Sequence, residues 1–103
     1  MVKRGEVWWA DLLDEGTRPA LVLTRDRAIP VVNRVVVVPA TRSIRRIPTE
    51  VLLSTQDGMP EDCALSFDNV STVPKSLLTS YICTLQPPRM EDVCRAWNDV
   101  VDC

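Results

Sequence analysis

Two apolar runs decide the fold of this chain: Gly16-Thr17-Arg18-Pro19-Ala20-Leu21-Val22-Leu23-Thr24 and Arg34-Val35-Val36-Val37-Val38-Pro39-Ala40-Thr41-Arg42. Each is typical of a β-strand that carries a cationic or polar residue at one end. If the two strands pair antiparallel, Arg18 at the start of the first lies beside Thr41 and Arg42 at the end of the second. A guanidinium next to a hydroxyl at the rim of a sheet is suited to binding a phosphate.

Outward from these runs, short apolar segments alternate with turn signals about every ten residues. The valines of the second run indicate burial on both faces, and Pro39 indicates a sheet edge or a bulge. Apolar residues at helical spacing after Pro87-Pro88 predict a closing helix through Met90, Val93, Cys94, Trp97 and Val101. We predict strands at residues 5–12, 18–24, 34–41, 50–53, 63–67, 70–73 and 80–85, turns at 13–16 and 56–58, and a single helical turn at 74–77. The pattern is that of a small, mainly antiparallel β-barrel with one C-terminal helix.

The length of 103 residues predicts one domain over residues 1–103. No run approaches the ~18 apolar residues of a membrane span, and the N-terminal residues lack the apolar core of a signal peptide, so we expect a cytoplasmic protein. The net charge of −2 argues against indiscriminate binding of nucleic acids. However, residues 1–46 carry nine Lys and Arg against five Asp and Glu, and residues 47–103 carry three against nine. This asymmetry favours one basic face on an acidic body.

The cysteines and the absence of histidine exclude several chemistries. Cys63, Cys83, Cys94 and Cys103 form no CxxC pair and there is no histidine, so neither a zinc site nor any cofactor is expected. Cys83 and Cys94 lie among apolar residues and are predicted to be core side chains, whereas Cys103 at the terminus is predicted to be an exposed thiol. Without an imidazole, Ser-His-Asp and Cys-His catalysis are excluded.

Four segments, in order, resemble the MazF/PemK (Kid) family of toxin endoribonucleases, whose fold is shared with CcdB. They are Lys3-Arg4-Gly5-Glu6-Val7-Trp8-Trp9-Ala10-Asp11-Leu12, Arg18-Pro19-Ala20-Leu21-Val22-Leu23, Val37-Val38-Pro39-Ala40-Thr41, and Asp68-Asn69 before Thr72-Val73. The resemblance implies an SH3-like barrel, a homodimer, and sequence-selective cleavage of single-stranded RNA without a metal. It also implies attack by the 2′-hydroxyl, which leaves a 2′,3′-cyclic phosphate and a 5′-hydroxyl, and a MazE-like antitoxin whose acidic tail occupies the RNA groove.

The family's catalytic residues map onto Arg18 and Thr41, which would stabilise the phosphorane. On structural grounds, Arg18 could instead pair with Glu15, and Thr41 could satisfy a turn. In some members an aspartate at the position of Asp68 is the general base, with an arginine two positions earlier as the acid. Here that earlier position is Ser66. Asp68 is therefore either a base or a turn cap together with Asn69.

Basic loop residues are candidate phosphate contacts. They are Arg25, Arg27, Arg42, Arg45 and Arg46, with Asn69 as a further RNA-binding candidate and Arg42 favoured because it adjoins Thr41. One of Trp8 and Trp9 is expected to face the core and the other the surface. The short segment from residue 13 to 17, where many members have a longer loop, predicts a more open groove that admits structured RNA.

Two other functions stay open on the sequence. One is a toxin of the same fold that poisons a protein such as DNA gyrase, and the other is a non-catalytic SH3-like RNA-binding module. The C-terminal helix, with its acidic residues, is not expected to be the RNA face.

Overall fold

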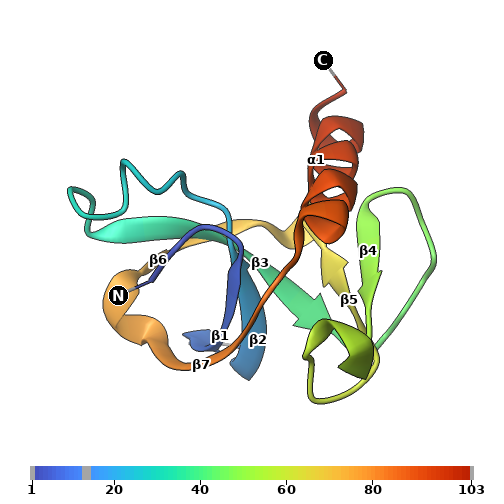
Figure 1. The fold of residues 1–103 in the computed structure, drawn as a ribbon, viewed down its shortest axis with the longest axis horizontal. Helices are drawn as coiled ribbons and strands as arrows, with labels where there is room; N and C mark the ends of the chain where they lie inside the picture. The colour runs from blue at the N-terminus through green and yellow to red at the C-terminus, as the bar shows by residue number, and fades with distance from the viewer. Residues whose placement is uncertain (1, 13–14, 103) are drawn as a thin grey trace.

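The computed structural model describes residues 2–12 and 15–102, which form an antiparallel sheet with one long helix (Figure 1). The strands are β1 (Glu6–Leu12), β2 (Gly16–Val22), β3 (Arg34–Thr41), β4 (Glu50–Leu53), β5 (Cys63–Ser66), β6 (Ser71–Pro74) and β7 (Leu78–Thr84), and the helix is α1 (Pro87–Val101). Single 3-10 turns lie at Thr55–Asp57, Phe67–Asn69 and Lys75–Leu77. The predicted mainly antiparallel fold with a C-terminal helix is confirmed.

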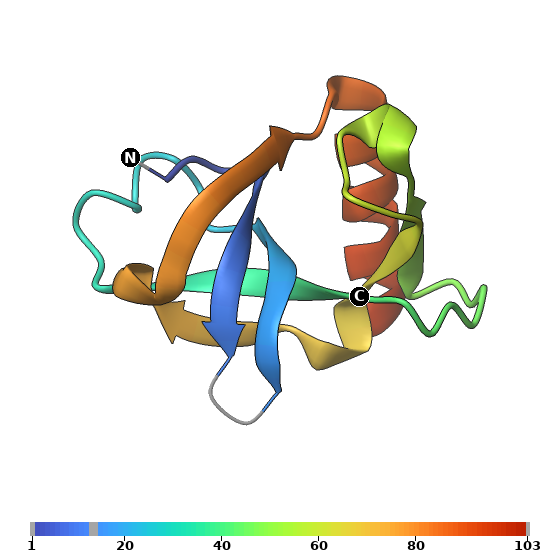
Figure 2. The same ribbon diagram turned by 90° about the horizontal axis from the view of Figure 1, so that it is seen from below.

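The sheet curls strongly around β1, β2 and β3 (Figure 2). Its strand order is β4-β5-β3-β2-β1-β7, and β6 pairs with β3 beside this path. Over the described residues, β4 and β7 end the path and do not pair with each other, so hydrogen bonding does not close the barrel. Of the predicted turn at residues 13–16, Leu13 and Asp14 lie outside the described residues, as does Cys103.

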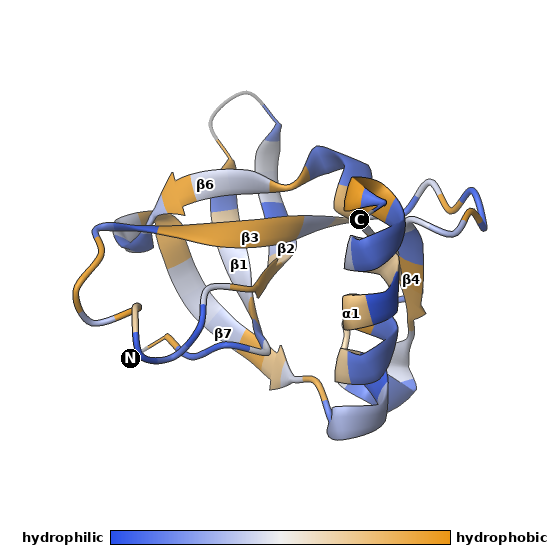
Figure 3. Cartoon of the chain, turned by 90° about the horizontal axis from the view of Figure 1, so that it is seen from above, coloured by the Kyte–Doolittle hydropathy of each residue, from blue (hydrophilic) through white to orange (hydrophobic). Residues whose placement is uncertain are grey.

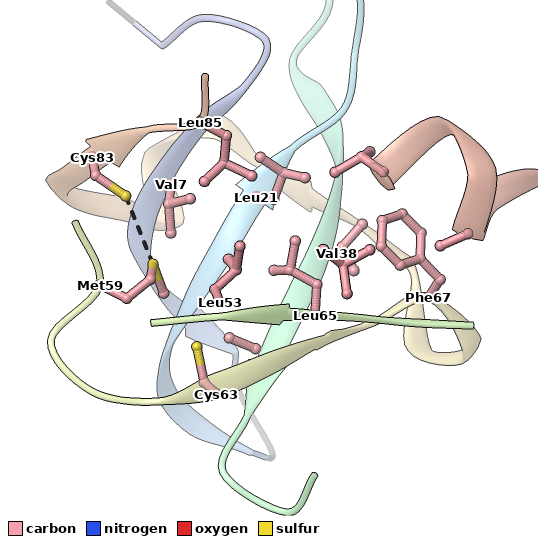
Figure 4. Packing of buried hydrophobic residues seen from close by; sticks show 14 residues of the cluster. Val7, Leu21, Val38, Leu53, Met59, Cys63, Leu65, Phe67, Cys83 and Leu85 are labelled. Atoms are coloured by element: carbon pink, nitrogen blue, oxygen red, sulfur yellow. Dashed lines mark hydrogen bonds between the residues drawn. The ribbon is translucent and has the colours of Figure 1, made fainter. Parts of the chain in front are cut away.

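β3 is shared by two cores, which is why its valine run is buried on both faces. Val35 and Val37 pack in one cluster with Ala20 of β2, whereas Val38 and Ala40 face the other cluster. Figure 4 shows part of that second cluster, in which Leu21 and Val38 meet Leu65 and Phe67. Alternate side chains of one strand point to opposite sides, so a strand between two cores must be apolar throughout.

Pro39 lies in an interior strand, and the structure shows why that is tolerated. β6 pairs with β3 only as far as Val37, and β5 begins its pairing at Ala40. The backbone of Val36 faces β2, since its oxygen accepts from the Leu23 N–H and its N–H donates to the Thr24 hydroxyl. By alternation the missing N–H of Pro39 faces the break between β6 and β5, where no ladder bond is lost.

β2 ends at Val22 rather than at the predicted Thr24. The Thr24 Oγ1 accepts the Val36 N–H at 2.8 Å, so a side chain replaces the main chain as the hydrogen-bond partner of β3. The residues after Thr24 form the turns of the loop that leads into β3. β3 and β4 have the predicted boundaries, and the remaining strand ends lie within two residues of the predictions, as expected for fraying ends.

Gly58 fixes the turn that places the segment after β4. Its φ of +99° lies in the left-handed region, and an added Cβ would lie 2.7 Å from the Cβ of Cys83. The glycine is required both by its backbone and by the close approach of β7. The turn brings Met59 to the sulfur of Cys83 at 3.7 Å (Figure 4) and leads into Pro60 and Glu61 at the surface.

Candidate active site

The structure brings Arg18 and Thr41 together at one rim of the sheet. β2 and β3 pair antiparallel, with Ala20 opposite Pro39 and Leu21 opposite Val38, so the same register carried outward sets Arg18 beside Thr41. The predicted antiparallel pairing is confirmed.

Two adjoining hollows of about 560 Å³ and 230 Å³ open at this rim. We call them together the rim groove. Both hollows are lined by Glu15, Arg18, Ala40, Thr41 and Ser43. The larger also has Trp9, Met59 and Glu61 in its wall, and the smaller extends to Arg45 and Asn69. Arg18 and Thr41 thus belong to the wall that the two hollows share.

Arg18 lines both hollows of the rim groove. The side chain is half-buried, and its Nε donates to the backbone carbonyl of Glu15 at 3.4 Å. No described residue accepts a hydrogen bond from the two terminal nitrogens of Arg18 or forms an ion pair with it. The contact with residue 15 therefore orients the guanidinium without neutralising it, and the bidentate edge stays available to an anion.

Thr41 satisfies a turn and still has a donor to offer. Its Oγ1 accepts the Ser43 N–H at 3.1 Å. A hydroxyl both accepts and donates, so this bond fixes the oxygen while the O–H can point into the groove. The turn role and the phosphate-binding role predicted from the sequence are compatible in one side chain.

Glu15 is a candidate that the sequence reasoning used only as an alternative partner for Arg18. Its side chain is exposed, lines both hollows, and forms no ion pair with any described residue. A carboxylate beside a guanidinium and a hydroxyl is the proton acceptor that the site otherwise lacks. Its position in the sequence could have indicated this role, because Glu15 directly precedes β2, three positions before Arg18.

Asp68 and Asn69 differ in their relation to the rim groove. Asn69 lines the smaller hollow and its Nδ2 donates to the Ser66 Oγ at 2.9 Å. Asp68 lines neither hollow, and its Oδ2 accepts the Thr49 hydroxyl at 2.6 Å. The structure therefore brings Asn69 to Arg18 and Thr41, whereas Asp68 binds the neighbouring loop.

The basic loop after β3 is held by one buried carboxylate. Arg42 lines the larger hollow and lies 3.6 Å from Glu61, both side chains being largely exposed. Arg45 lines the smaller hollow and its Nε lies 3.4 Å from Glu50. The Glu50 side chain is 1% exposed and also accepts the backbone N–H groups of Arg45 and Arg46, at 2.9 and 3.1 Å.

Glu50 is a second residue that the sequence reasoning missed as part of the site. It allows Arg46 to hold the left-handed φ of +56°, and so it shapes the loop that carries Arg45. Burying a carboxylate is costly unless it is paired and hydrogen-bonded, and here three donors converge on it. The sequence signal was a lone acid at the start of an apolar strand.

Two of the predicted RNA contacts lie elsewhere. Arg25 and Arg27 are on the loop between β2 and β3, at the far end of these strands from Arg18. Arg25 lines a separate groove beside α1, and neither residue lines the rim groove. We therefore leave both out of the proposed RNA contacts.

The tryptophans divide between core and groove, as expected for neighbours on a strand. Trp8 packs against the core cluster of Ala20 and Val35, and its indole N–H donates to Glu6 at 3.0 Å. Trp9 lines the rim groove, and its indole N–H reaches no hydrogen-bond acceptor within the described part of the chain. Both side chains remain partly exposed.

The cysteines are single thiols in the structure. Cys63 lines the rim groove, and burial, helped by the nearby carboxylate of Glu61, raises its pKa to about 11. Cys83 is buried as predicted, but Cys94 is exposed, so its predicted core position is wrong. It lies one position past the buried Val93, on the border of the apolar face of α1. The described residues hold no group of three or more Cys, Asp or Glu arranged to bind a metal ion.

Comparison with known proteins agrees with this fold. A family model described as PemK-like, MazF-like toxin of type II toxin-antitoxin system matches residues 3–101. The chain belongs to this family, which confirms the resemblance found in its sequence. “Probable endoribonuclease MazF5” of Mycobacterium tuberculosis (strain ATCC 25618 / H37Rv) is 40% identical over 101 residues, 97% of this chain and 93% of that protein.

Solved structures of similar proteins share the whole architecture. The Mycobacterium tuberculosis toxin MazF-mt6 superposes with a TM-score of 0.88 at 29% identity, over 94% of this chain and 96% of that one. An endoribonuclease in complex with its cognate antitoxin, from a mycobacterial species, gives a TM-score of 0.90 at 26% identity, over 99% and 96%. Within the described residues, no helix is long and apolar enough to cross a membrane.

Proposed function

We propose that this MazF-type endoribonuclease cleaves single-stranded RNA through attack of a ribose 2′-hydroxyl on the adjacent phosphorus. The observation that carries the proposal is the rim groove, where a guanidinium, a hydroxyl and a carboxylate line the same hollows. Neither charged group forms an ion pair within residues 2–12 and 15–102. Such a reaction needs no nucleophile from the protein. It needs an aligned RNA backbone, stabilised charge on the phosphorane and a proton acceptor.

Arg18 and Thr41 bind the scissile phosphate in this proposal. The two terminal nitrogens of Arg18 donate to the non-bridging oxygens, and the Thr41 hydroxyl adds a third hydrogen bond. Because both groups are oriented beforehand, by the Glu15 carbonyl and the Ser43 N–H, little reorganisation accompanies charge build-up on the phosphorane.

Glu15 is the proposed general base. Its carboxylate takes the proton from the 2′-hydroxyl as the oxygen–phosphorus bond forms, and the bond to the 5′-oxygen breaks. The 5′-oxygen leaves with a proton from water, and the products are a 2′,3′-cyclic phosphate and a 5′-hydroxyl. Asp68, the base suggested by the family resemblance, stays an alternative prediction, and a Glu15→Gln against Asp68→Asn comparison distinguishes the two.

The walls of the rim groove supply the RNA contacts. Arg42 and Arg45 reach phosphates on either side of the cleaved one, and Asn69 offers an amide to a base or a ribose. Trp9 offers an aromatic surface on which a base can stack. The proposed substrate is a single-stranded stretch of mRNA, tRNA or ribosomal RNA. Its cleavage in the cytoplasm would arrest translation and growth.

A MazE-like antitoxin and a second copy of the chain are the proposed protein partners. The antitoxin is supported by family membership and by the complex of the similar mycobacterial endoribonuclease. Measuring the mass of the free protein by sedimentation tests the homodimer, since a monomeric mass at micromolar concentration would contradict it.

One assay tests the function against the two alternatives left by the sequence. The purified protein is incubated with a single-stranded RNA in EDTA, and the product ends are analysed. We expect cyclic-phosphate and 5′-hydroxyl ends that disappear with Arg18→Ala. Binding without cleavage would indicate a non-catalytic module, and intact RNA with growth arrest would indicate a toxin that poisons a protein.

A further inference from the structure

One wall of the rim groove comes from the connection between β4 and β5 rather than from a strand. Met59, Pro60 and Glu61 line the larger hollow together with Arg18 and Thr41. We call the first three residues the outer wall. They lie between the end of β4 and the start of β5, outside the sheet. The position of the outer wall, and with it the width of the hollow, therefore depends on the contacts of this connection.

The outer wall is anchored at Met59 and open at Glu61. Met59 is 3% exposed, and its sulfur lies 3.7 Å from the sulfur of Cys83. Pro60 and Glu61 are exposed, and the ion pair of Glu61 with Arg42, at 3.6 Å, is largely exposed as well. Exposed ion pairs hold a position only weakly. The turn that precedes Met59 is therefore the main support of the outer wall.

Asp57 organises that turn. Its Oδ2 accepts the Ser54 N–H at 3.0 Å, and the Ser54 Oγ accepts the Gln56 N–H at 3.2 Å. The Ser54 carbonyl accepts the Met59 N–H at 3.3 Å. Asp57 thus fixes the residue to which the start of the outer wall is hydrogen-bonded.

The same carboxylate binds α1. Its Oδ1 accepts the Nε–H of Arg89 at 2.9 Å, across 32 positions of the sequence. Figure 2 shows the start of α1, in orange, beside the yellow-green turn at Thr55–Asp57. The Asp57 side chain is only 12% exposed, so the pair is screened less than a surface pair. Hydrogen bonds to Asp57 and then to Asp92 raise the pKa of the Arg89 guanidinium.

The stability of α1 does not explain the position of Arg89. The first turn of the helix, residues 87–90, carries this arginine and no acid. The N-terminal end of a helix has a partial positive charge, so a cation there is unfavourable. α1 lies beside β4 (Figure 3) and packs on the core through the buried Val93 and Ala96. The contact with Asp57 accounts for an arginine at the start of the helix.

We propose that Asp57 is a positioning residue for RNA cleavage: tied to Arg89, it holds the outer wall at a fixed distance from Arg18 and Thr41. The inference rests on the proposed function, since RNA is the ligand that the wall contacts. The outer wall contains none of the proposed reacting groups. Its contacts with RNA are therefore the same before and during the reaction, and such contacts lower KM without changing kcat.

Variants of the ion pair and one matched control test the proposal on the full-length protein. Asp57→Asn keeps an oxygen for the Ser54 N–H and removes the charge that binds Arg89. Arg89→Gln removes the cation instead, and the double variant joins both changes. Asp92→Asn is the control, because it takes the other carboxylate from Arg89 and leaves the pair with Asp57.

Each variant is measured at a temperature where circular dichroism shows it to be folded. Steady-state kinetics on a short single-stranded RNA give kcat and KM. Fluorescence anisotropy gives the Kd of the same RNA with 2′-deoxyribose at the cleavage site mapped from the products. Hydrogen exchange of the Gly58 and Met59 amides, which donate to the Thr55 and Ser54 carbonyls, reports on the turn without RNA.

We expect Asp57→Asn and Arg89→Gln each to raise KM and Kd about five- to tenfold, with kcat within about twofold of the wild type. The double variant should match the single ones, because all three lose the same pair. Exchange at Gly58 and Met59 should quicken in these variants. Asp92→Asn should leave KM and exchange unchanged.

The proposal fails on any of the following results. Effects of the single variants that add in the double variant would show that Asp57 and Arg89 act separately. Faster exchange with an unchanged KM would show that the outer wall does not contact RNA. A lower kcat at an unchanged KM would show that Asp57 acts on the reaction and not on RNA binding.

Two further readouts keep the test decisive. If Asp57→Asn does not fold, Arg89→Gln carries the test, since its side chain is 42% exposed and its loss leaves the turn's own hydrogen bonds intact. If the wild type neither cleaves nor binds RNA, the proposed function fails, and the exchange data still show whether the pair fixes the turn.

Discussion

The rim groove and a groove of about 660 Å³ beside α1, which we call the helix groove, share the strands β2 and β3 but are built for different ligands. Leu23, Val36 and Trp97 are among the residues that line the helix groove. At the rim, a guanidinium, a hydroxyl and a carboxylate converge where β2 starts and β3 ends, and the nearby arginines are held by Glu50 or face Glu61. At the other end, arginines that form no ion pair with any described residue line a groove together with leucine, valine and tryptophan. Polar groups held in fixed positions suit a reaction, whereas exposed apolar area between cations suits association.

The largest effect that would separate the two grooves is expected from Arg18→Ala. The variant loses the fork that binds the phosphorane, so kcat/KM for RNA should fall about 1000-fold. Arg27→Ala, which removes the same charge from a distant loop, is the control in a single-turnover cleavage assay. Arg18→Ala with wild-type cleavage would remove Arg18 from the site.

A smaller effect is expected from Glu50→Gln, which weakens the support of the basic loop. The amide accepts at one oxygen only, so the N–H groups of Arg45 and Arg46 and the Arg45 guanidinium lose part of their shared partner. The free energy of unfolding should fall by about 1–3 kcal/mol, and the KM for RNA should rise several-fold. Urea denaturation and steady-state kinetics measure both.

The matched control for this loop is Glu91→Gln on the exposed side of α1. It changes the same charge without touching the loop, and it should leave both quantities unchanged. A normal KM in Glu50→Gln would show that the loop geometry does not matter for RNA binding.

Chemical labelling of Cys94 offers a milder perturbation of the helix groove alone. Cys94 is exposed and lines this groove. Burial raises the pKa of Cys63 to about 11 and also raises the pKa of Cys83. The thiols of Cys63 and Cys83 therefore stay protonated at pH 8 and react slowly. In a Cys103→Ser background, iodoacetamide should add one group, read by mass spectrometry. We expect RNA cleavage to continue, because Cys94 does not line the rim groove. A loss of cleavage after labelling would show that the two grooves are coupled.

The smallest effect concerns the helix that forms one wall of the second groove. Hydrogen bonds from Arg95 and then Arg89 lower the pKa of Asp92 below its ordinary value. A carboxyl whose folded pKa is lowered stabilises the fold above its unfolded pKa, near 4, and loses that contribution as the pH falls through the folded pKa. Asp92→Asn should lower Tm by about 1–2 °C at pH 7, and the difference should vanish by about pH 2. A difference that persists at low pH would point to packing rather than charge.

The strand pattern and the helix could be predicted because their causes are local. The valine run, the Gly58 turn and the Pro87-Pro88 start each act through nearby backbone, and each lies where it was predicted. The exposure of Cys94 could not be predicted in this way. It depends on which side of α1 meets the sheet, and a cysteine at the border of the apolar face satisfies the helical spacing in either case.

Some residues of the candidate site could likewise be predicted from the sequence, and others could not. Arg18 and Thr41 could be paired from the sequence because two antiparallel strands leave one register that buries both apolar runs. The carboxylates could not be placed, because Glu15 and Asp68 both lie in connections whose path depends on the rest of the fold. The one local signal of Glu50, a lone acid at the start of an apolar strand, does not reveal its partners, since its three donors come from a loop that folds back onto β4.

The sequence by itself determined a curled antiparallel sheet with a closing helix, its family, and the meeting of Arg18 with Thr41. These follow from side-chain alternation and strand pairing, which are short-range or topological. The tertiary structure decided which charges act together. In the folded chain Glu15 lines the rim groove, and Asp68 accepts a hydrogen bond from Thr49. Arg25 lines an apolar groove beside α1. Charges on loops are set by where the loops pack, and no local pattern encodes that.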